Sequence, residues 1–473
     1  MKRFIFFLFL SFGATAQLRE VAETTMILPD GVNEDIEVVA VNEDIILVNF
    51  QEDFLKREQR VMVMKYNSAL ELVWVGSAVV PRFYLPVSFV VNGQILHYLV
   101  REKEGKKMHL AQFDLGNETI SVSDFETITL LENINFTVFN GQPLISGILN
   151  LKPVVEMHNL KDKTARVLPD IYTKNNELKG IFINPYRDEL YVFSSMTRNC
   201  QMQMATYDAN GKFLFRRSIG DKKHRVRQLE IKFGPGGEPF VLGSYNSACL
   251  DMAEGLFGGS LDFPESIRYH SIANLPGFRA SLSEKKRKRL QLRRERGKSG
   301  AVRQRAIFHV PVSGVNGFLL ATEFYNIQST SRAAPQVNFT PASDRGIPFS
   351  EHKVWRILLA EVDSEGEVSF DRLYKIEGDP FYGLQPQSAF LFKNETFYAF
   401  LPLGSRLIYA GADKPEYHPL FNTGEVFRMT DTRAQLFNLN IHSFIAHGTT
   451  EINPVAAEGT SQQIYFIKKF EFQ

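Results

Sequence analysis

The side chains that could do chemistry are scattered through this sequence and form no recognised catalytic pattern. Its 10 histidines include no His-Glu-x-x-His pair of metal ligands, and no Gly-x-Ser-x-Gly turn offers a serine nucleophile. Arg296-Gly-Lys-Ser299 resembles the end of a phosphate-binding loop, but Leu292 stands where its first glycine would have to be. We therefore expect no cofactor and no metal, and the sequence identifies no catalytic residue.

Paired carboxylates are the remaining catalytic option. Glu34-Asp35, Glu43-Asp44 and Glu52-Asp53 lie near the ends of apolar runs. A glycosidase needs two carboxylates held about 5–9 Å apart across a cleft, whereas carboxylates at turns are more commonly solvated. An extracytoplasmic hydrolase or lyase acting on glycan or peptide is therefore the alternative function, not the leading one.

A strongly basic segment is the best candidate for a binding function. Residues 279–305 contain twelve Lys or Arg against Glu284 and Glu295, a net charge of +10. The pattern Ser281-x-x-Glu284 predicts a capped helix that ends near Gly297. Such a helix could dock on phosphates or on an acidic protein face. The candidate contact residues are Lys285, Lys286, Arg287, Lys288, Arg289, Arg293, Arg294 and Arg296.

The same charges also have a purely structural interpretation. Loss of Lys2 and Arg3 with a leader takes the net charge of the chain from +1 to −1, so the rest of the mature chain carries −11. The basic helix could therefore lie across its own acidic domain and neutralise it. Nucleic acid is not expected as a partner, because no aromatic residues interleave with the charges for base stacking. A second basic group could add to the first: Arg216, Arg217, Lys222, Lys223, Arg225 and Arg227.

The two cysteines follow similar apolar runs. Cys200 ends LYVFSSMTRNC at 190–200, and Cys249 ends PFVLGSYNSAC at 239–249. If the two runs are equivalent strands of successive repeats, the cysteines occupy equivalent places. They could form a disulfide if their Cα atoms lie within about 7 Å, or they could be two separate buried side chains.

The first sixteen residues predict export. Lys2 and Arg3 precede a short apolar run from Phe4 to Phe12, and Ala14-Thr15-Ala16 supplies a cleavage site. The apolar run is much shorter than the roughly 20 residues of a spanning helix, and no later segment spans a bilayer. No cysteine follows the cleavage site, so we do not expect a lipoprotein. The mature protein, residues 17–473, is expected in the periplasm, outside the cell or at the cell surface.

Short strands dominate the mature chain. The content of 44% hydrophobic and 23% charged residues excludes intrinsic disorder and a coiled coil. Apolar, β-branched and aromatic runs are broken by turn residues, as at Asp44–Phe50, Gln59–Tyr66, Gln94–Val100 and Leu190–Phe193. The 40 phenylalanines suit sheets that are covered on both faces.

The strands repeat in groups of about 50 residues. We expect an aromatic or apolar residue followed by Asp or Asn to close each group. Successive pairs are spaced by 47, 45, 49, 54 and 101 residues, and a unit of this length suits a four-stranded propeller blade. The pairs are Tyr66-Asn67, Phe113-Asp114, His158-Asn159, Tyr207-Asp208, Leu261-Asp262 and Val362-Asp363. The strands that open the groups should line a central channel: Ile36–Val41, Val87–Val91, Phe136–Phe139 and Gly180–Ile183.

The predicted fold is therefore an all-β propeller of about six to eight four-stranded blades, with tandem β-sandwiches as the alternative. The C-terminal strand Gln463–Phe472 should close the ring against N-terminal residues near 18–40. Two insertions interrupt the single domain: the basic helix at about 274–305, and a loop at 326–352 rich in Ser, Thr, Pro and Ala that we expect to be mobile.

Part of this pattern resembles a known group of proteins. Gly-Ser-Tyr-Asn at 243–246, the basic helix, AIFHVPVSGVNGFLLATEFYN at 306–326 and VWRILLAEVDSEGEV at 354–368 are similar to uncharacterised exported propeller-like proteins of Bacteroidetes-type bacteria. The resemblance covers roughly residues 225–380 and the closing strand. It implies export and a propeller fold, and it implies no activity.

The function expected from the sequence is thus a non-enzymatic binding or scaffold protein of the bacterial envelope. Its expected partner is an envelope protein or an anionic envelope component. The basic helix and the 326–352 loop are the expected contact elements.

Overall fold

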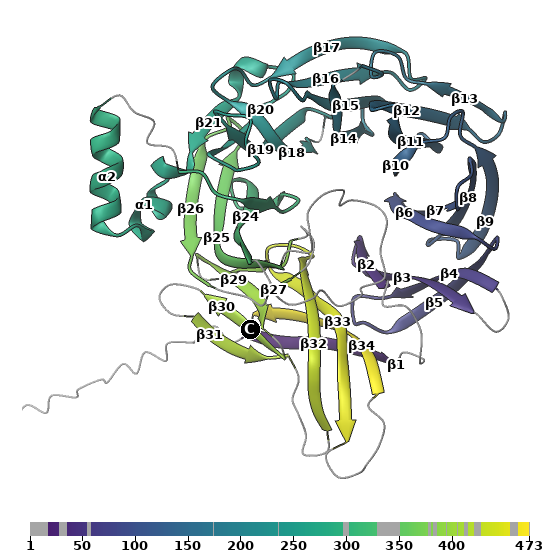
Figure 1. Ribbon diagram of the computed structural model, residues 1–473. Coiled ribbons are helices and arrows are strands. Elements are labelled where there is room, and N and C mark those ends of the chain that lie inside the picture. The colour runs from purple at the N-terminus through teal and green to yellow at the C-terminus, as the bar shows by residue number, and fades with distance from the viewer. Residues whose placement is uncertain are drawn as a thin grey trace, which may run out of the picture.

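The apolar runs of the sequence form strands, and successive groups of four strands form separate antiparallel sheets in the computed structural model (Figure 1). Eight such sheets, or blades, are counted over the residues that the structure describes. The described residues are 18–27, 36–53, 58–173, 175–234, 236–296, 302–328, 351–376, 380–381, 386–393, 395–403, 405–410, 415–420, 427–454 and 462–472. The prediction of a propeller is confirmed, and tandem sandwiches are excluded.

Blades 1 to 4 follow one another along the chain without rearrangement. Blade 1 contains β2 (Ile36–Val41), β3 (Asp44–Asp53), β4 (Glu58–Tyr66) and β5 (Leu72–Val80). Blade 2 contains β6 (Tyr84–Asn92), β7 (Ile95–Glu102), β8 (Lys107–Asp114) and β9 (Thr119–Glu126). Blade 3 contains β10 (Glu132–Phe139), β11 (Gln142–Leu149), β12 (Lys152–Asn159) and β13 (Thr164–Val167). Blade 4 contains β14 (Asn176–Asn184), β15 (Glu189–Met196), β16 (Met202–Tyr207) and β17 (Phe213–Ile219).

Blades 5 to 8 include the irregular elements. Blade 5 contains β18 (Arg225–Phe233), β19 (Pro239–Asn246), β20 (Gly255–Ser260) and β21 (Arg268–Ser271). Blade 6 contains β22 (Ala306–Phe308), β24 (Gly317–Gln328), β25 (Glu351–Asp363) and β26 (Val368–Tyr374), with β23 (Val312–Ser313) and β27 (Pro380–Phe381) paired to β24 and β25. Blade 7 contains β28 (Ala389–Lys393), β29 (Thr396–Leu403), β30 (Arg406–Ala410) and β31 (Pro415–Pro419). Blade 8 contains β32 (Phe427–Asn438), β33 (Ser443–Pro454), β34 (Gln462–Phe472) and β1 (Leu18–Ile27).

The helices are short and belong to blades 5 and 6. Two 3-10 turns, η1 (Pro264–Ser266) and η2 (Ile272–Asn274), flank β21. They are followed by α1 (Pro276–Ser281) and α2 (Glu284–Glu295), which lie between β21 and β22. No helix in the described residues is long and apolar enough to cross a membrane.

Burial differs with radius in the ring. Figure 1 shows β6, β10, β14 and β18 toward the centre and β9, β13 and β17 on the outside. Middle strands such as β19 are buried along their whole length, whereas every residue of β13 is exposed. Neighbouring blades cover both faces of a middle strand, which explains its unbroken apolar sequence. The strands that were predicted to open each group lie within β2, β6, β10 and β14, the first strands of their blades.

The repeated Asp or Asn does not close a blade, and that prediction is wrong. It lies at the end of the third strand, and a fourth strand follows it. The side chain caps the turn between those two strands: Asp114 Oδ1, for example, accepts hydrogen bonds from the N–H groups of Gly116 and Asn117 at 3.0 and 2.9 Å. Equivalent caps are made by Asn67, Asn159, Asp208 and Asp363. The spacing of 101 residues between Asp262 and Asp363 is therefore the length of one blade plus the two insertions.

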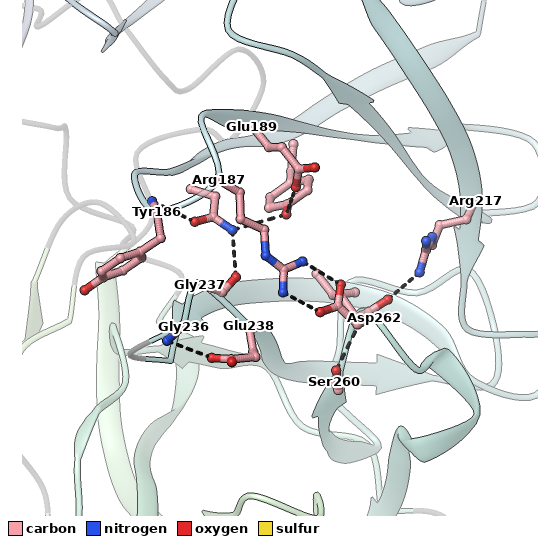
Figure 2. A network of polar contacts seen from close by, with 12 residues as sticks. Tyr186, Arg187, Glu189, Arg217, Gly236, Gly237, Glu238, Ser260 and Asp262 are labelled. Carbon is pink, nitrogen blue, oxygen red and sulfur yellow. Dashed lines mark hydrogen bonds and ion pairs between the residues drawn. The ribbon is translucent and has the colours of Figure 1, made fainter.

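Asp262 fits the repeat but uses its carboxylate differently. Its two oxygens accept hydrogen bonds from the Arg187 guanidinium at 3.0 and 2.8 Å, which ties blade 5 to blade 4 (Figure 2). Arg217 on β17 adds a hydrogen bond to the carbonyl oxygen of Leu261. Asn184 donates to the carbonyl oxygen of Gly237 at 2.8 Å. This network replaces the usual turn cap with contacts between blades.

The antiparallel order gives the ring two different ends. The turn face carries the connections between first and second strands and between third and fourth strands. The linker face carries the connections between second and third strands and the segments between blades. Cys200 lies between β15 and β16 and Cys249 between β19 and β20, so both are on the linker face. They form a disulfide with a Cα–Cα distance of 5.7 Å that joins blades 4 and 5.

The basic insertion also belongs to the linker face. It joins blades 5 and 6, and the other insertion joins β24 to β25 within blade 6. The boundaries predicted for the second insertion, 326–352, are too wide, because residues 326–328 and 351–352 pair as strand. Residues 329–350 lie outside the described residues.

The ring closes through the two ends of the chain. β1 pairs antiparallel with β34, from Leu18 opposite Phe472 to Ile27 opposite Ile464. The predicted closing strand is confirmed. Lys468 in β34 is 2% exposed, and its Nζ donates to Glu20 Oε2 and Glu23 Oε2 in β1, both at 2.9 Å. Burial raises the pKa of Glu20. Burial also acts to raise the pKa of Glu23, but hydrogen bonds from Glu20 and Lys468 outweigh it, so the pKa of Glu23 is lowered.

Replacing Lys468 with Met is expected to weaken closure. The change leaves two carboxylates facing each other without their cation. Breaking a buried pair costs about 3–5 kcal/mol, and because both carboxylates are partly solvated we expect about 2 kcal/mol. Lys469→Met is the matched control, since Lys469 makes a surface pair with Glu471 at 3.2 Å. Urea unfolding of the mature protein measures both; equal midpoints for the two variants would contradict the closing role of Lys468.

Candidate functional site

The basic insertion is held to blade 6 by apolar side chains of α1 and its flanks. Leu275, Phe278 and Leu282 are buried in one cluster with Leu320 and Leu358 of β24 and β25. Phe278 is only 1% exposed. Pro276 begins α1, where its missing N–H costs no intrahelical hydrogen bond. The short helix α1 is thus the anchor of the insertion.

Asp371 of β26 fastens the start of α1. Its Oδ2 accepts a hydrogen bond from the Phe278 N–H at 3.2 Å, and the Gly277 N–H also bonds to this carboxylate. Burial raises the pKa of Asp371. A Cβ on residue 277 would lie 2.6 Å from the Asp371 carbonyl oxygen, so only glycine allows this close approach.

The second helix, α2, carries the charges. Leu290 packs against the cluster that holds α1. Leu292 is 50% exposed. Figure 1 shows α2 outside the ring, beside α1 and beyond β26. The predicted contact residues Lys285, Lys286, Arg287, Lys288, Arg289, Arg293 and Arg296 are all exposed, and the Arg294 side chain lies outside the described residues.

These cations are not neutralised by the blades in the described structure. Within the described residues, α2 contains an internal ion pair between Lys288 Nζ and Glu284 Oε1, which are 2.8 Å apart. No ion pair joins a described α2 cation to a carboxylate of a blade there. A helix lying across an acidic surface would show such pairs. The geometry therefore favours an outward-facing positive surface over internal charge compensation.

The predicted start of the basic helix is wrong. Ser281 is the last residue of α1, and its hydroxyl donates to the carbonyl oxygen of Phe278 at 2.6 Å. The helix α2 begins at Glu284, with the Arg287 N–H bonded to the Ser283 carbonyl oxygen. Gly297, which was expected to end the helix, lies outside the described residues.

The four arginines of the second basic group bond to other segments of the ring. Arg216 and Arg217 donate to the carbonyl oxygens of Asp170 and Leu261. Arg225 donates to the carbonyl oxygen of Ser247 at 2.8 Å, and Arg227 pairs with Asp251 at 3.4 Å. Lys222 and Lys223 are exposed. These arginines therefore connect segments of the ring and do not extend the surface of α2.

A buried group of catalytic residue types lies between blades 6 and 7. His309 Nε2 is 2.8 Å from Glu323 Oε1 and 3.0 Å from Ser388 Oγ. Glu323 Oε1 also accepts the N–H groups of Gln387 and Ser388 at 2.7 and 2.6 Å. In a Ser-His-acid triad the serine and the acid use different ring nitrogens, whereas here both contact Nε2.

This group is therefore a structural clamp. Ser388 is 1% exposed and Glu323 is fully buried, so a substrate has no access to either. The carboxylate fastens β24 to the residues that lead into β28. Sequence reasoning missed it, because the three residues lie far apart in the chain and share no motif.

The carboxylate pairs considered in the sequence form no described catalytic pair. Asp44 forms an ion pair with Lys65 at 3.3 Å, and Glu52 accepts a hydrogen bond from Gln59 at 3.4 Å. Glu34, Asp35 and the Asp53 side chain lie outside the described residues. In the described parts of the chain no group of three or more His, Cys, Asp or Glu side chains is placed to hold a metal.

Comparison with known proteins finds only distant structural similarities. No protein-family model and no curated protein matches the chain. Dihydro-heme d1 dehydrogenase NirN in complex with DHE is similar at 12% identity over 94% of this chain and 78% of that one, with a TM-score of 0.43. A prolyl endopeptidase is similar at 10% identity over 93% of this chain, which spans only 54% of that protein, with a TM-score of 0.38. The Dos1 propeller is similar at 7% identity over 86% of this chain and 96% of that one, with a TM-score of 0.39. At these scores none of the three bears on the chemistry of this chain.

Asp371→Ala is expected to loosen the insertion without unfolding the ring. Two N–H groups of α1 lose their buried acceptor, which costs about 1–3 kcal/mol. Hydrogen exchange should therefore become faster in residues 276–296. Asp363→Ala is the matched control on the same blade, because Asp363 caps the turn at 363–367 on the opposite face. Unchanged exchange in 276–296 of Asp371→Ala would show that the carboxylate does not hold α1.

Proposed function

We propose that this chain is an exported, non-catalytic propeller that binds an anionic partner in the bacterial envelope through α2. In this proposal the ring is the scaffold and the basic insertion on blade 6 is the contact element. The partner is an envelope protein with an acidic face or an anionic envelope component.

One observation carries this proposal: in the part of the chain that is described, the cations of α2 are exposed and form no ion pairs with carboxylates of the blades. Six exposed Lys and Arg side chains on α2, with Arg296 directly after it, create a strong local positive potential. The firm anchoring of α1 supports the same conclusion, because a helix that is fixed in position loses less entropy when it binds.

Export is the part of the proposal that rests on the sequence. The expected leader at residues 1–16 lies outside the described residues. The disulfide on the linker face is consistent with an oxidising compartment. The resemblance to exported proteins of Bacteroidetes-type bacteria points the same way.

A hydrolase or lyase with its site at the mouth of the propeller is the alternative. It would need convergent, accessible catalytic side chains. The His309, Glu323 and Ser388 group has the right residue types, but it is buried and bonded as a clamp. The binding function is therefore the better supported of the two.

The proposal predicts that neutralising the outer side of α2 abolishes partner capture. Lys285, Arg289 and Arg296 are exposed and lie away from Leu290, the residue of α2 that packs on the ring. Each cation near an anionic surface contributes about 1 kcal/mol. Changing all three to Gln should therefore weaken binding on the order of 100-fold. The measurement is co-purification of the tagged mature protein with crosslinked partners from its native envelope.

A second triple variant controls for net charge alone. Lys161, Lys163 and Lys212 are exposed on blades 3 and 4, and changing them to Gln removes the same charge far from α2. This variant should capture the partner as the unchanged protein does. Equal capture by both variants would remove α2 from the contact, and no partner in any sample would favour the enzyme alternative.

A further inference from the structure

A hollow of about 360 Å³ lies between the helical insertion and blade 6. The segment that links α1 to α2 forms one wall, with Ser281 and Ser283, and Lys286 of α2 extends it. Arg356 and Lys375 of blade 6 form the opposite wall. This size is at the lower end of the range for small-molecule sites, about 300–1,000 Å³.

Three cations converge on this hollow from three separate elements. Lys286 lies one turn before Leu290 and so on the side of α2 that faces the ring. Ile357 pairs with Tyr374, and Arg356 and Lys375, the residues next to this pair, both line the hollow. Lys375 directly follows β26 and lines the hollow together with Ser281, the last residue of α1.

This arrangement is costly for the protein alone. Like charges that line one small hollow repel one another. Arg356 is half-buried, and burial lowers the pKa of its guanidinium. Its guanidinium carbon lies 3.9 Å from the centre of the Trp355 ring, which fixes its position. No carboxylate forms an ion pair with any of the three cations within the described residues.

We infer that this hollow binds a phosphomonoester group. A dianionic phosphate between Lys286, Arg356 and Lys375 would offset both the repulsion and the cost of burying Arg356. Guanidinium groups match phosphate oxygens with paired hydrogen bonds, and the Ser283 hydroxyl offers a further polar contact. The volume leaves room for atoms of the group that carries the phosphate.

The inference deepens the proposed function and rests on it for the source of the ligand. The phosphate would belong to an anionic envelope component, either a phosphorylated glycan or a lipid headgroup. Both sources present the same phosphomonoester chemistry to the three cations.

Titration calorimetry of the mature protein with inorganic phosphate and with glucose 1-phosphate tests the site, and sedimentation with phosphatidic acid vesicles tests the lipid source. We expect Arg356→Gln and Lys375→Gln each to weaken phosphate binding about tenfold or more. Lys161→Gln on blade 3, far from the hollow, should leave phosphate binding unchanged. Binding of glucose 1-phosphate without vesicle binding would assign the site to glycan phosphates, and binding to phosphatidic acid but not phosphatidylcholine vesicles would assign it to lipid.

The two variants must also keep their fold. Removing one of the cations that line the hollow should leave the ligand-free melting temperature equal or higher, and phosphate should raise it only in the unchanged protein. The inference is overturned if the unchanged protein does not bind phosphate, or if Arg356→Gln and Lys375→Gln bind it as tightly as the unchanged protein does. Phosphate binding that persists while envelope capture fails contradicts the proposed function and leaves the site standing.

Discussion

The pairing of β1 with β34 is the interaction on which the rest of this structure depends. A stack of blades that did not close would leave two unpaired sheet edges and two uncovered blade faces. The N-terminal strand supplies the outermost strand of blade 8, and the buried Lys468 ties it to the C-terminal strand through Glu20 and Glu23. Closure also sets the positions of the remaining blades, so the residues that bridge them meet only in the complete ring.

The two faces of the ring have different roles. On the turn face, Asp and Asn side chains cap the turns between third and fourth strands, and Arg187 with Asp262 joins two blades there (Figure 2). Most of those polar groups therefore form hydrogen bonds within the protein itself. The linker face carries the disulfide and the helical insertion. Variation on this face does not disturb the repeating turns, which is why a contact element is better placed there.

The sequence was sufficient to predict most of the fold. Alternating apolar runs and a period near 50 residues predicted the strands, and the terminal strand predicted closure. Blade number was left open because the two insertions double one spacing. The role of the repeated Asp was misread because a strand of four exposed residues such as β13 has little apolar signal.

The site was only partly predictable for a related reason. The charge of α2 is visible in the sequence, because its cations are consecutive. Arg356 and Lys375 are far apart in the sequence and line the same hollow because β25 pairs with β26. His309, Glu323 and Ser388 likewise meet through the packing of two blades. Such groupings depend on strand register, which local sequence patterns do not reveal.

Site-specific photocrosslinking from α2 in the native envelope tests the central claim most directly. A photoreactive residue in place of Leu292 would stand among the cations on an exposed part of the helix. The same residue in place of Leu151, which is 79% exposed on blade 3, is the control. The account predicts a discrete crosslinked product from position 292 that is absent from position 151. No product from 292, or the same products from both positions, would contradict it.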